Sequence, residues 1–245
     1  RVATMLMNLM YHHLNSDCCS NDAEMFHRHL AHIREHYHSV FPGESPGKNA
    51  VCLTFDDAYA DFYYLVFPLL KNFGLKAVLG VPTSVILEKT EEPPEVRMGF
   101  KHDDHFANYR RGTFCTFEEM REMRDSGLVC FASHSHNHVV LTDPGVDLDQ
   151  ELWESKAILE RALGLKIDSF VFPFGRYDEA LLKAVLTGYR YAFRIGNAVH
   201  KDFSGIGGVN YRVNGDDLTA PDSVFRFGKR LGFRTKALVK RALAA

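Results

Sequence analysis

Apolar and amphipathic segments alternate along the chain. The expected strands are the apolar runs at 2–10, 50–55, 76–82, 128–133, 169–173, 191–195 and 208–213. The expected helices, where apolar residues recur at helical spacing, cover 23–37, 61–72, 117–126, 149–163 and 178–187. Phe26, Leu30 and Ile33 illustrate this spacing, because they fall on one face of the first helix. Strands that alternate with helices predict βαβ units and a parallel sheet.

The number of these units favours a closed barrel over an open sheet. About seven strand–helix units in 245 residues indicate an α/β protein built as one barrel. In such a barrel, functional residues collect where strands end and loops begin. The long polar loop at 88–111 is expected to form a lid or rim there.

The chain is expected to form one domain. It contains no Pro/Gly/Ser-rich linker, low-complexity run or internal repeat, so we assign 1–220 to the domain and 221–245 to a basic helical segment. The last 22 residues contain seven Lys or Arg and no Asp or Glu. A solvated helix, packed on the domain or extending from it, is favoured over contact with a membrane surface.

Composition excludes several classes of protein. The net charge of −2 gives no overall attraction to nucleic acid, and no apolar run is long enough to span a membrane. Five cysteines without a C-x-x-C pair indicate reduced thiols rather than a disulfide framework. The apolar N-terminus lacks the basic start and the cleavage site of a signal peptide. We therefore expect a cytoplasmic or cytoplasmic membrane-associated protein, or an extracytoplasmic one if a signal peptide has been removed.

An acid pair follows the strand at 50–55. Asp56 and Asp57, in the phrase "TFDD", lie where that strand ends. Two adjacent carboxylates are costly to hold together unless a cation or a proton is shared between them. The ordinary alternative is that one of them caps the next helix, so the pair alone is weak evidence for a site.

Three histidines follow the strand at 128–133. His134, His136 and His138, in "SHSHNH", would share one face of a continuing strand, whereas on a helical turn only His134 and His138 would be neighbours. Two imidazoles and one carboxylate form a common open metal site. Together with the acid pair at another strand end, they favour a metal site over ordinary surface histidines.

Several phrases together resemble a known family. "TFDDAYAD", "SHSHNHVVL" and "FVFPFG" occur in the order typical of the polysaccharide deacetylases, which share the NodB-homology domain of carbohydrate esterase family 4. "MYHHL" and "TFEEMREMRDSGL" also resemble the family, so the likeness runs from Met5 to about Val213. The resemblance implies a single-domain distorted (β/α)7-type barrel.

The resemblance also implies roles for individual residues. Asp56 would be the general base and Asp57 a metal ligand. The family's H-[ST]-x-x-H motif makes His134 and His138 the other two ligands, and it leaves His136 at a variable position. The metal would be a divalent ion, usually zinc, which lowers the pKa of bound water from 15.7 to about 7.

The phrase "FVFPFG" would contribute to the substrate site. The family pattern implies that Pro173 contacts substrate and that the backbone amide of Phe174 donates to the developing oxyanion. The motif normally carries an arginine that orients the catalytic aspartate, which is Asp56 in this chain. Val171 stands in the place of that arginine here. Arg176 and Arg212 are the candidates to replace it and to contact the substrate. Ala58 replaces the usual glycine after the acid pair.

The general acid is less clearly marked. The family's late leucine-x-histidine motif is absent, and the only histidine after residue 138 is His200. Some circularly permuted exopolysaccharide deacetylases place this acid in a "YH" phrase at the end of an N-terminal strand. His12 in "MYHHL" matches that phrase and is favoured over His13. His102 and His105, in the rim loop, are third choices.

The favoured hypothesis is a metal-dependent de-N-acetylase, which would hydrolyse the acetamide of an N-acetylated hexosamine in a polysaccharide or glycan precursor. One alternative is a hydrolase of a small cyclic amide or imide on the same fold. The other is a carbohydrate-binding protein whose catalytic site has decayed.

Overall fold

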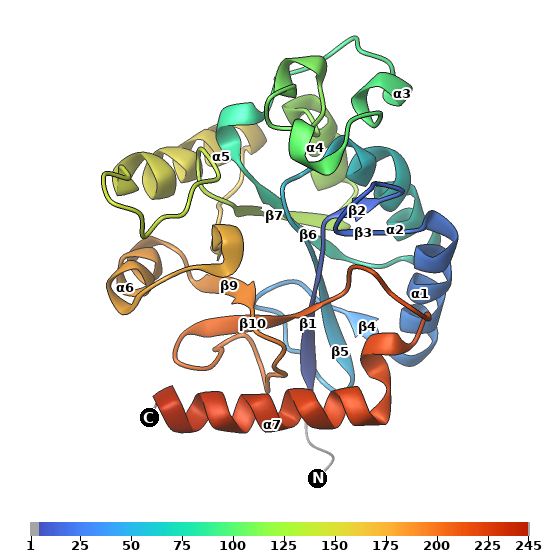
Figure 1. The fold of residues 1–245 in the computed structure, drawn as a ribbon, viewed down its shortest axis with the longest axis vertical. Coiled ribbons are helices and arrows are strands. Elements are labelled where there is room, and N and C mark those ends of the chain that lie inside the picture. Colours follow the sequence, from blue (N-terminus) through green and yellow to red (C-terminus); the bar gives the residue numbers. More distant parts are fainter. Residues whose placement is uncertain (1–4, 245) are drawn as a thin grey trace.

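The computed structural model describes residues 5–244, and a barrel of parallel strands forms its centre (Figure 1). The barrel strands, in chain order, are β1 (Leu6–Tyr11), β5 (Ala50–Phe55), β6 (Ala77–Val81), β7 (Val129–Ser133), β8 (Ser169–Val171), β9 (Tyr191–Ile195) and β10 (Val209–Asn214). β1 closes the barrel because it pairs in parallel with β10 on one side and with β5 on the other. The closed seven-stranded barrel expected from the sequence is confirmed.

Three shorter strands lie outside the barrel. β4 (His38–Ser39) extends the sheet beside β5, and β2 (His13–Leu14) pairs with β3 (Ser20–Asn21) in a separate parallel ribbon. This ribbon begins directly after β1. The loop between β2 and β3 therefore lies at the end of the barrel where the carboxyl ends of the parallel strands meet.

Helices surround the barrel (Figure 1). They are α1 (Ala23–His36), α2 (Phe67–Phe73), α3 (Pro94–Arg97), α4 (Phe117–Asp125), α5 (Ser155–Leu163), α6 (Glu179–Gly188) and α7 (Phe227–Ala244). π-Helical turns at Phe62–Val66 and Asp149–Glu154 precede α2 and α5. Pro68 has no amide hydrogen for a regular helical bond, so a continuous α-helix over 61–72 is interrupted near it.

Local signals decide where several helices begin. The side chain of Asp22 caps α1, and Thr116 and Glu119 form the expected capping box at the start of α4. Short 3₁₀ turns occupy Thr83–Val85, His102–Asp104, Tyr109–Arg111, Pro173–Gly175 and Ser223–Phe225. The segment at 88–111 is therefore partly helical. Of the first expected strand, residues 2–4 lie outside the described part of the chain.

Side chains alternate between the inside and the outside of the barrel. Along β5, Ala50 and Cys52 belong to a small cluster, whereas Val51, Leu53 and Phe55 belong to the larger cluster that packs under the helices. On the central strands the small cluster uses compact side chains, because a seven-stranded barrel leaves little room inside; these are Ala50, Cys52, Val78, Ala132 and Val171. Polar residues at the carboxyl ends of the barrel strands therefore come close together.

α7 lies across the barrel beside β1 and β10, near the N-terminal end of the described chain (Figure 1). Phe233 and Ala237 are its buried residues, and Lys240 Nζ lies 4.1 Å from the centre of the Tyr211 ring. Between residues 5 and 244, no helix is both long and apolar enough to cross a membrane.

Candidate active site

The acid pair lies at the end of β5. Asp56 and Asp57 are both 4% exposed. Asp56 still belongs to the sheet, because its N–H donates to the Tyr11 carbonyl, whereas Asp57 and Ala58 have φ angles of 70° and 55°. This left-handed turn redirects the chain, so two adjacent carboxylates reach the same side of the barrel. Ala58 adopts a backbone conformation that glycine occupies more easily.

Asp57 meets two histidines. Its Oδ1 lies 3.3 Å from His134 Nε2 and 3.0 Å from His138 Nε2. Burial alone would raise the pKa of Asp57, but His138 and His134 outweigh it and hold that pKa well below its usual range. Oδ1 makes no hydrogen bond within residues 5–244 although it is buried. A buried, unpaired carboxylate oxygen facing two ring nitrogens fits a bound cation.

A hydrogen bond to the backbone fixes the orientation of the His134 ring. Its Nδ1 donates to the Val171 carbonyl at 2.8 Å, so Nε2 carries the lone pair that faces Asp57. His136 points elsewhere, because its Nδ1 lies 2.8 Å from Thr83 Oγ1. The cluster whose ligand atoms lie within 4.8 Å of one another contains Asp57, His134 and His138. The structure therefore brings together the three residues expected to bind metal.

Glu151 holds the histidine turn in shape. Its carboxylate accepts from the N–H groups of His136 and Asn137 at 2.9 and 2.8 Å, and from the Asn137 side chain at 2.7 Å. Ser135 and His138 have φ angles of 66° and 52°, which turn the backbone sharply after β7. Sequence reasoning missed Glu151, because an acid within an amphipathic helix carries no signal that it is buried.

Asp56 is paired with Arg212. Arg212 Nη1 and Nη2 donate to the two carboxylate oxygens of Asp56 at 2.5 and 2.7 Å, and both residues are buried. Val171, which stands where the family has arginine, lies in the inner cluster of the barrel. The guanidinium therefore reaches Asp56 from β10 instead of β8. Arg176 is exposed and forms no ion pair within the described residues.

His12 lies on the other side of Asp56. Its Nε2 is 3.8 Å from Asp56 Oδ2, and its Nδ1 lies 2.6 Å from Asp216 Oδ2. Burial lowers the pKa of His12, but Asp216, Asp56 and Asp57 together raise it to about 9. Sequence reasoning missed Asp216, because no local pattern distinguishes it from other acids that follow a strand.

The other candidate histidines lie elsewhere. His13 Nδ1 donates to Asp61 Oδ2 at 2.9 Å, and its ring stacks on Tyr59. His105 is buried beside His13 and Tyr59. The His200 Nε2 atom lies 3.0 Å from the Tyr211 carbonyl. Among the candidates for the general acid, the structure places His12 beside Asp56.

The acid pair, the histidine pair and His12 all line one cavity of about 220 Å³. Its walls include His12, Asp56, the three clustered metal-ligand candidates and Arg212. Phe174 also lines it, with a φ angle of 56°, and no acceptor for its N–H is found within residues 5–244. Pro173 is buried, and neither Pro173 nor Arg176 lines this cavity.

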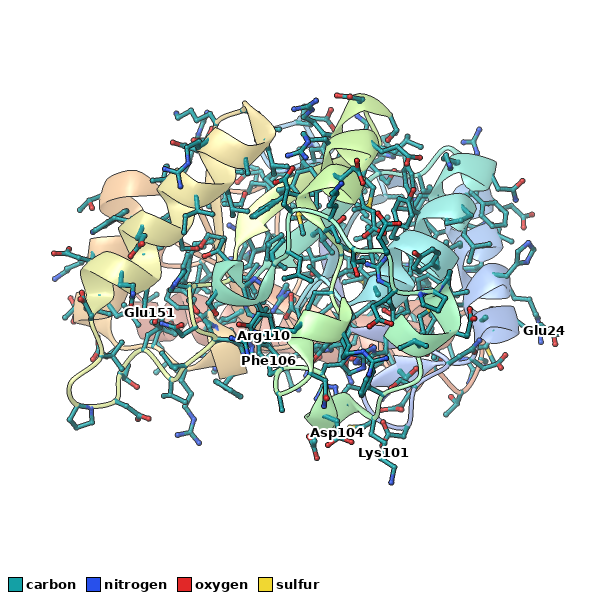
Figure 2. The ribbon with its side chains drawn as sticks, turned by 90° about the horizontal axis from the view of Figure 1, so that it is seen from above. Glu24, Lys101, Asp104, Phe106, Arg110 and Glu151 are labelled. Carbon is teal, nitrogen blue, oxygen red and sulfur yellow. The ribbon has the colours of Figure 1, made fainter. Side chains whose placement is uncertain are left out.

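The rim segment at 88–111 closes one side of the site. The Phe106 ring stacks on the His138 ring with centroids 4.9 Å apart. Arg97 is buried and anchors the segment, because its guanidinium donates to Glu119 at 2.6 and 2.9 Å. Seen from above, the segment with Phe106 and Arg110 lies between Glu151 and the distant helix α1 (Figure 2).

The sequence is similar to known polysaccharide deacetylases. A family model described as polysaccharide deacetylase matches residues 43–192. YxkH of Bacillus subtilis (strain 168), assigned to the polysaccharide deacetylases, is 28% identical over 195 residues, which cover 74% of this chain and 61% of YxkH. The poly-β-1,6-N-acetyl-D-glucosamine N-deacetylase of Escherichia coli (strain K12) is 36% identical over 108 residues, 44% of this chain and 14% of that enzyme. The matched part is thus less than two thirds of either relative.

The fold is also similar to a solved structure. The Streptococcus pyogenes deacetylase PplD, in complex with acetate, superposes with a TM-score of 0.72 at 22% identity. The match covers 91% of this chain and 98% of PplD. At this identity the likeness shows a common fold, the (β/α)7 barrel.

Proposed function

Because the chain belongs to the polysaccharide deacetylase family, we propose that it is a metal-dependent de-N-acetylase acting on an N-acetylated hexosamine within a glycan. Members of this family are hydrolases that cleave amide C–N bonds. The observation that carries the proposal is the convergence of Asp56, His12 and the Asp57–His134–His138 cluster on one cavity. The name of the Escherichia coli relative supports an N-acetylglucosamine polymer as the substrate.

Asp57, His134 and His138 are the residues that would hold the metal. One carboxylate and two neutral imidazoles are a donor set typical of catalytic zinc. When bound, a divalent ion supplies a Lewis acid for the acetamide carbonyl and acidifies water. The cluster offers three ligand atoms, so it leaves room for water and substrate.

Asp56 is suited to act as the general base. Burial opposes its ionisation, but the ion pair with Arg212 outweighs burial and lowers the pKa of Asp56. The carboxylate is therefore ionised near neutral pH and accepts a proton from the attacking water. Arg212 positions it through two hydrogen bonds.

His12 is suited to act as the general acid. With a pKa of about 9 it is protonated at neutral pH, and Asp216 holds its Nδ1. Nε2 then donates a proton to the departing amine, which is a very poor leaving group without one. Phe174 lines the cavity, and its backbone N–H would donate to the developing oxyanion.

Acetate release from oligomers of poly-β-1,6-N-acetylglucosamine tests the proposal. We expect activity to disappear after chelation, to return with added zinc, and to be lost in Asp57→Ala. His136→Ala is the matched control, because it removes an imidazole from the same turn but outside the cluster. Full activity in the chelated protein, or no acetate from any N-acetylhexosamine glycan by the zinc-loaded protein, would contradict it.

A further inference from the structure

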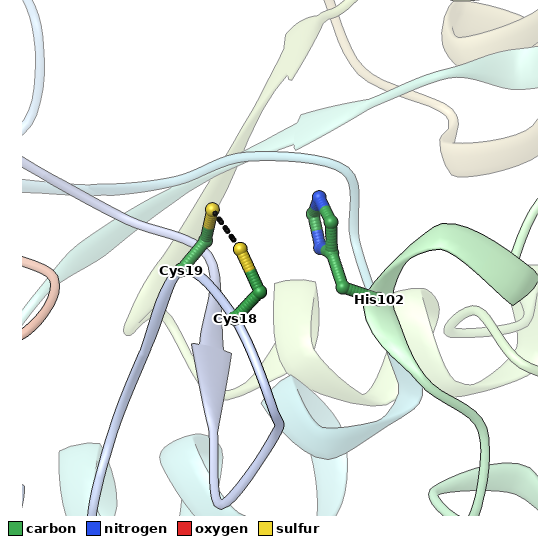
Figure 3. A group of neighbouring side chains, drawn as sticks. All are labelled: Cys18, Cys19 and His102. Carbon is green, nitrogen blue, oxygen red and sulfur yellow. Dashed lines mark hydrogen bonds between the residues drawn. The ribbon is translucent and has the colours of Figure 1, made fainter.

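A second group of potential metal ligands lies at the edge of the catalytic cavity. Cys18 and Cys19 are adjacent in the loop between β2 and β3, and their Sγ atoms are 3.1 Å apart. A ring nitrogen of His102 lies beside them, so that these three ligand atoms are all within 4.8 Å of one another (Figure 3). None of these residues has a role in the chemistry described above.

The backbone makes the two thiols converge. Adjacent side chains on an extended strand point to opposite faces, but Cys19 has a φ angle of 49°, in the left-handed region. The short β2–β3 ribbon holds this turn in place, because the His13 N–H donates to the Cys19 carbonyl. A strained, non-glycine turn that brings two thiols together is an arrangement that a bound ligand would use.

His102 is attached to this loop and oriented from behind. The backbone N–H of His102 donates to Asp17 Oδ1 at 2.9 Å, and this hydrogen bond joins the rim segment to the cysteine loop. The Asp61 carboxylate accepts from His13 Nδ1, and His13 Nε2 lies 3.2 Å from His102 Nδ1. In the tautomer in which His13 Nδ1 donates to Asp61, His102 Nδ1 donates to His13 Nε2, and the other ring nitrogen of His102 keeps its lone pair. Such a carboxylate–histidine relay is typical of a metal-binding histidine.

We propose that Cys18, Cys19 and His102 bind a thiophilic metal ion of the Zn²⁺, Cd²⁺ or Cu⁺ class. Two sulfur atoms and one imidazole select soft ions, whereas the Asp57 cluster offers an oxygen and no sulfur. Binding displaces one proton from each thiol, and each thiolate donates an electron pair to the ion. Cys19 and His102 also line the catalytic cavity. An ion held there narrows the cavity, so thiophilic metals in excess inhibit turnover from this second site.

Cadmium titration of the reduced, metal-free chain tests this site. Cd²⁺ bound to thiolate gives a sulfur-to-metal absorption band in the ultraviolet, whereas Cd²⁺ at the Asp57 cluster gives none. We expect a band whose final intensity corresponds to one thiolate-bound ion per chain, with protons released as it forms. Cys18→Ser and Cys19→Ser should each weaken the binding that produces the band by about 100-fold or more. Cys130→Ser, which changes a thiol in β7, is the matched control.

Three results would overturn the proposal. They are the absence of a band, a band that persists in the Cys18→Ser/Cys19→Ser double variant, and a Cys18–Cys19 disulfide found by mass in protein prepared under reductant. Far-ultraviolet circular dichroism of each variant confirms that it is folded. Because the readout is sulfur absorption, the outcome does not depend on whether the protein deacetylates glycans.

An independent observation concerns the outer face of α7. Within residues 5–244, five of the seven large apolar side chains that are exposed belong to this helix: Phe227, Leu231, Leu238, Val239 and Leu243. Phe227 and Leu243 are 83% and 84% exposed. The buried face of the helix, with Phe233 and Ala237, is already in use against the barrel. The apolar residues on the other face therefore have no partner within the described chain.

Charge indicates what covers that face. Residues 226–244 contain seven Lys or Arg and no Asp or Glu. An apolar stripe flanked by basic residues only is the pattern of a helix that lies in the interface of an anionic bilayer. We infer that α7 docks the protein on an anionic lipid surface, with the stripe in the acyl boundary and the basic residues against the headgroups.

Sedimentation with vesicles tests this inference. We expect binding to vesicles containing phosphatidylglycerol that weakens with salt, and little binding to pure phosphatidylcholine vesicles. Leu231→Gln and Leu238→Gln should each weaken binding by about tenfold. Leu186→Gln, an exposed apolar residue on α6, is the control. Equal binding to both vesicle types, or a dimer in light scattering that these α7 variants disrupt, would overturn the inference.

Discussion

Replacing Arg212 with leucine is expected to leave Asp56 as a buried charge without its partner. The pair is joined by two hydrogen bonds of 2.5 and 2.7 Å, and both residues are almost wholly buried. At about 4 Å between charge centres and an effective dielectric constant of about 20, their attraction is about 4 kcal/mol. Breaking such a pair costs about 3–5 kcal/mol. The free energy of unfolding should fall by that amount.

Catalysis should fall as well, because Asp56 loses the group that orients it. We expect kcat to drop by about 100-fold or more, the usual contribution of a positioned general base. Urea denaturation measures the free energy of unfolding, and acetate release measures kcat. Arg176→Leu is the stability control, since this arginine is exposed and unpaired within the described residues. It should change the free energy of unfolding by less than about 0.5 kcal/mol.

The barrel also offers a rescue. A Cβ atom built on Gly80 would lie 3.6 Å from both Asp56 Oδ1 and Val171 Cγ2, so both side chains border the space beside Gly80 inside the barrel. Val171→Arg in the Arg212→Leu background should therefore recover part of the lost stability and turnover, because it returns a guanidinium to Asp56 from β8. Full stability and turnover in Arg212→Leu alone would refute the reasoning. If Val171→Arg restores neither stability nor turnover, a guanidinium on β8 cannot replace the one that Arg212 places from β10.

Three further outcomes follow from the same contacts. Asp216→Asn removes a negative charge that raises the pKa of His12, so the basic limb of the kcat profile should move to lower pH; an unchanged limb would exclude His12 as the titrating acid. Glu151→Gln keeps the shape but weakens the support of the histidine turn, so zinc affinity, measured against a competing chelator, should fall about 10–100-fold. Burial lowers the pKa of His29 to about 4, below its unfolded value of about 6.5. The contribution of neutral His29 to stability is therefore complete above pH 6.5 and is lost as the pH falls towards 4. This contribution is at most about 3 kcal/mol. Denaturation at pH 7.5 and 5 should show a smaller loss for His29→Gln than for the unchanged chain, and equal losses would contradict this assignment.

Local sequence patterns determined most of the fold. The apolar runs and helical spacings predict the elements and the barrel, because burial on both faces of a strand or one face of a helix leaves a periodic trace. The capping box at Thr116 and Glu119 was likewise readable from four successive positions. The π-turns before α2 and α5 were missed, since they depend on packing as well as on composition.

The sequence also identified the residues that gather at the site, but not how each is supported. It marked Asp56, Asp57 and the His134–His138 pair through their places at strand ends. It favoured His12 over His13 from the resemblance alone, because the orientation of each ring depends on where β1 ends. The structure resolves the orientation: β1 ends at Tyr11, His12 turns toward Asp56, and His13 begins the next strand and bonds to Asp61.

Only the tertiary structure decided which distant groups complete the site. Arg212 and Asp56 are 156 positions apart in sequence, and Asp216 and His12 are 204 apart. These pairs meet because β1 lies between β5 and β10 when the barrel closes. Nothing local distinguishes Arg212 from Arg176, or Asp216 from other acids that follow a strand. Closure of the barrel brings its first strand, β1, beside its last, β10, and that contact supplies the partners of both catalytic candidates.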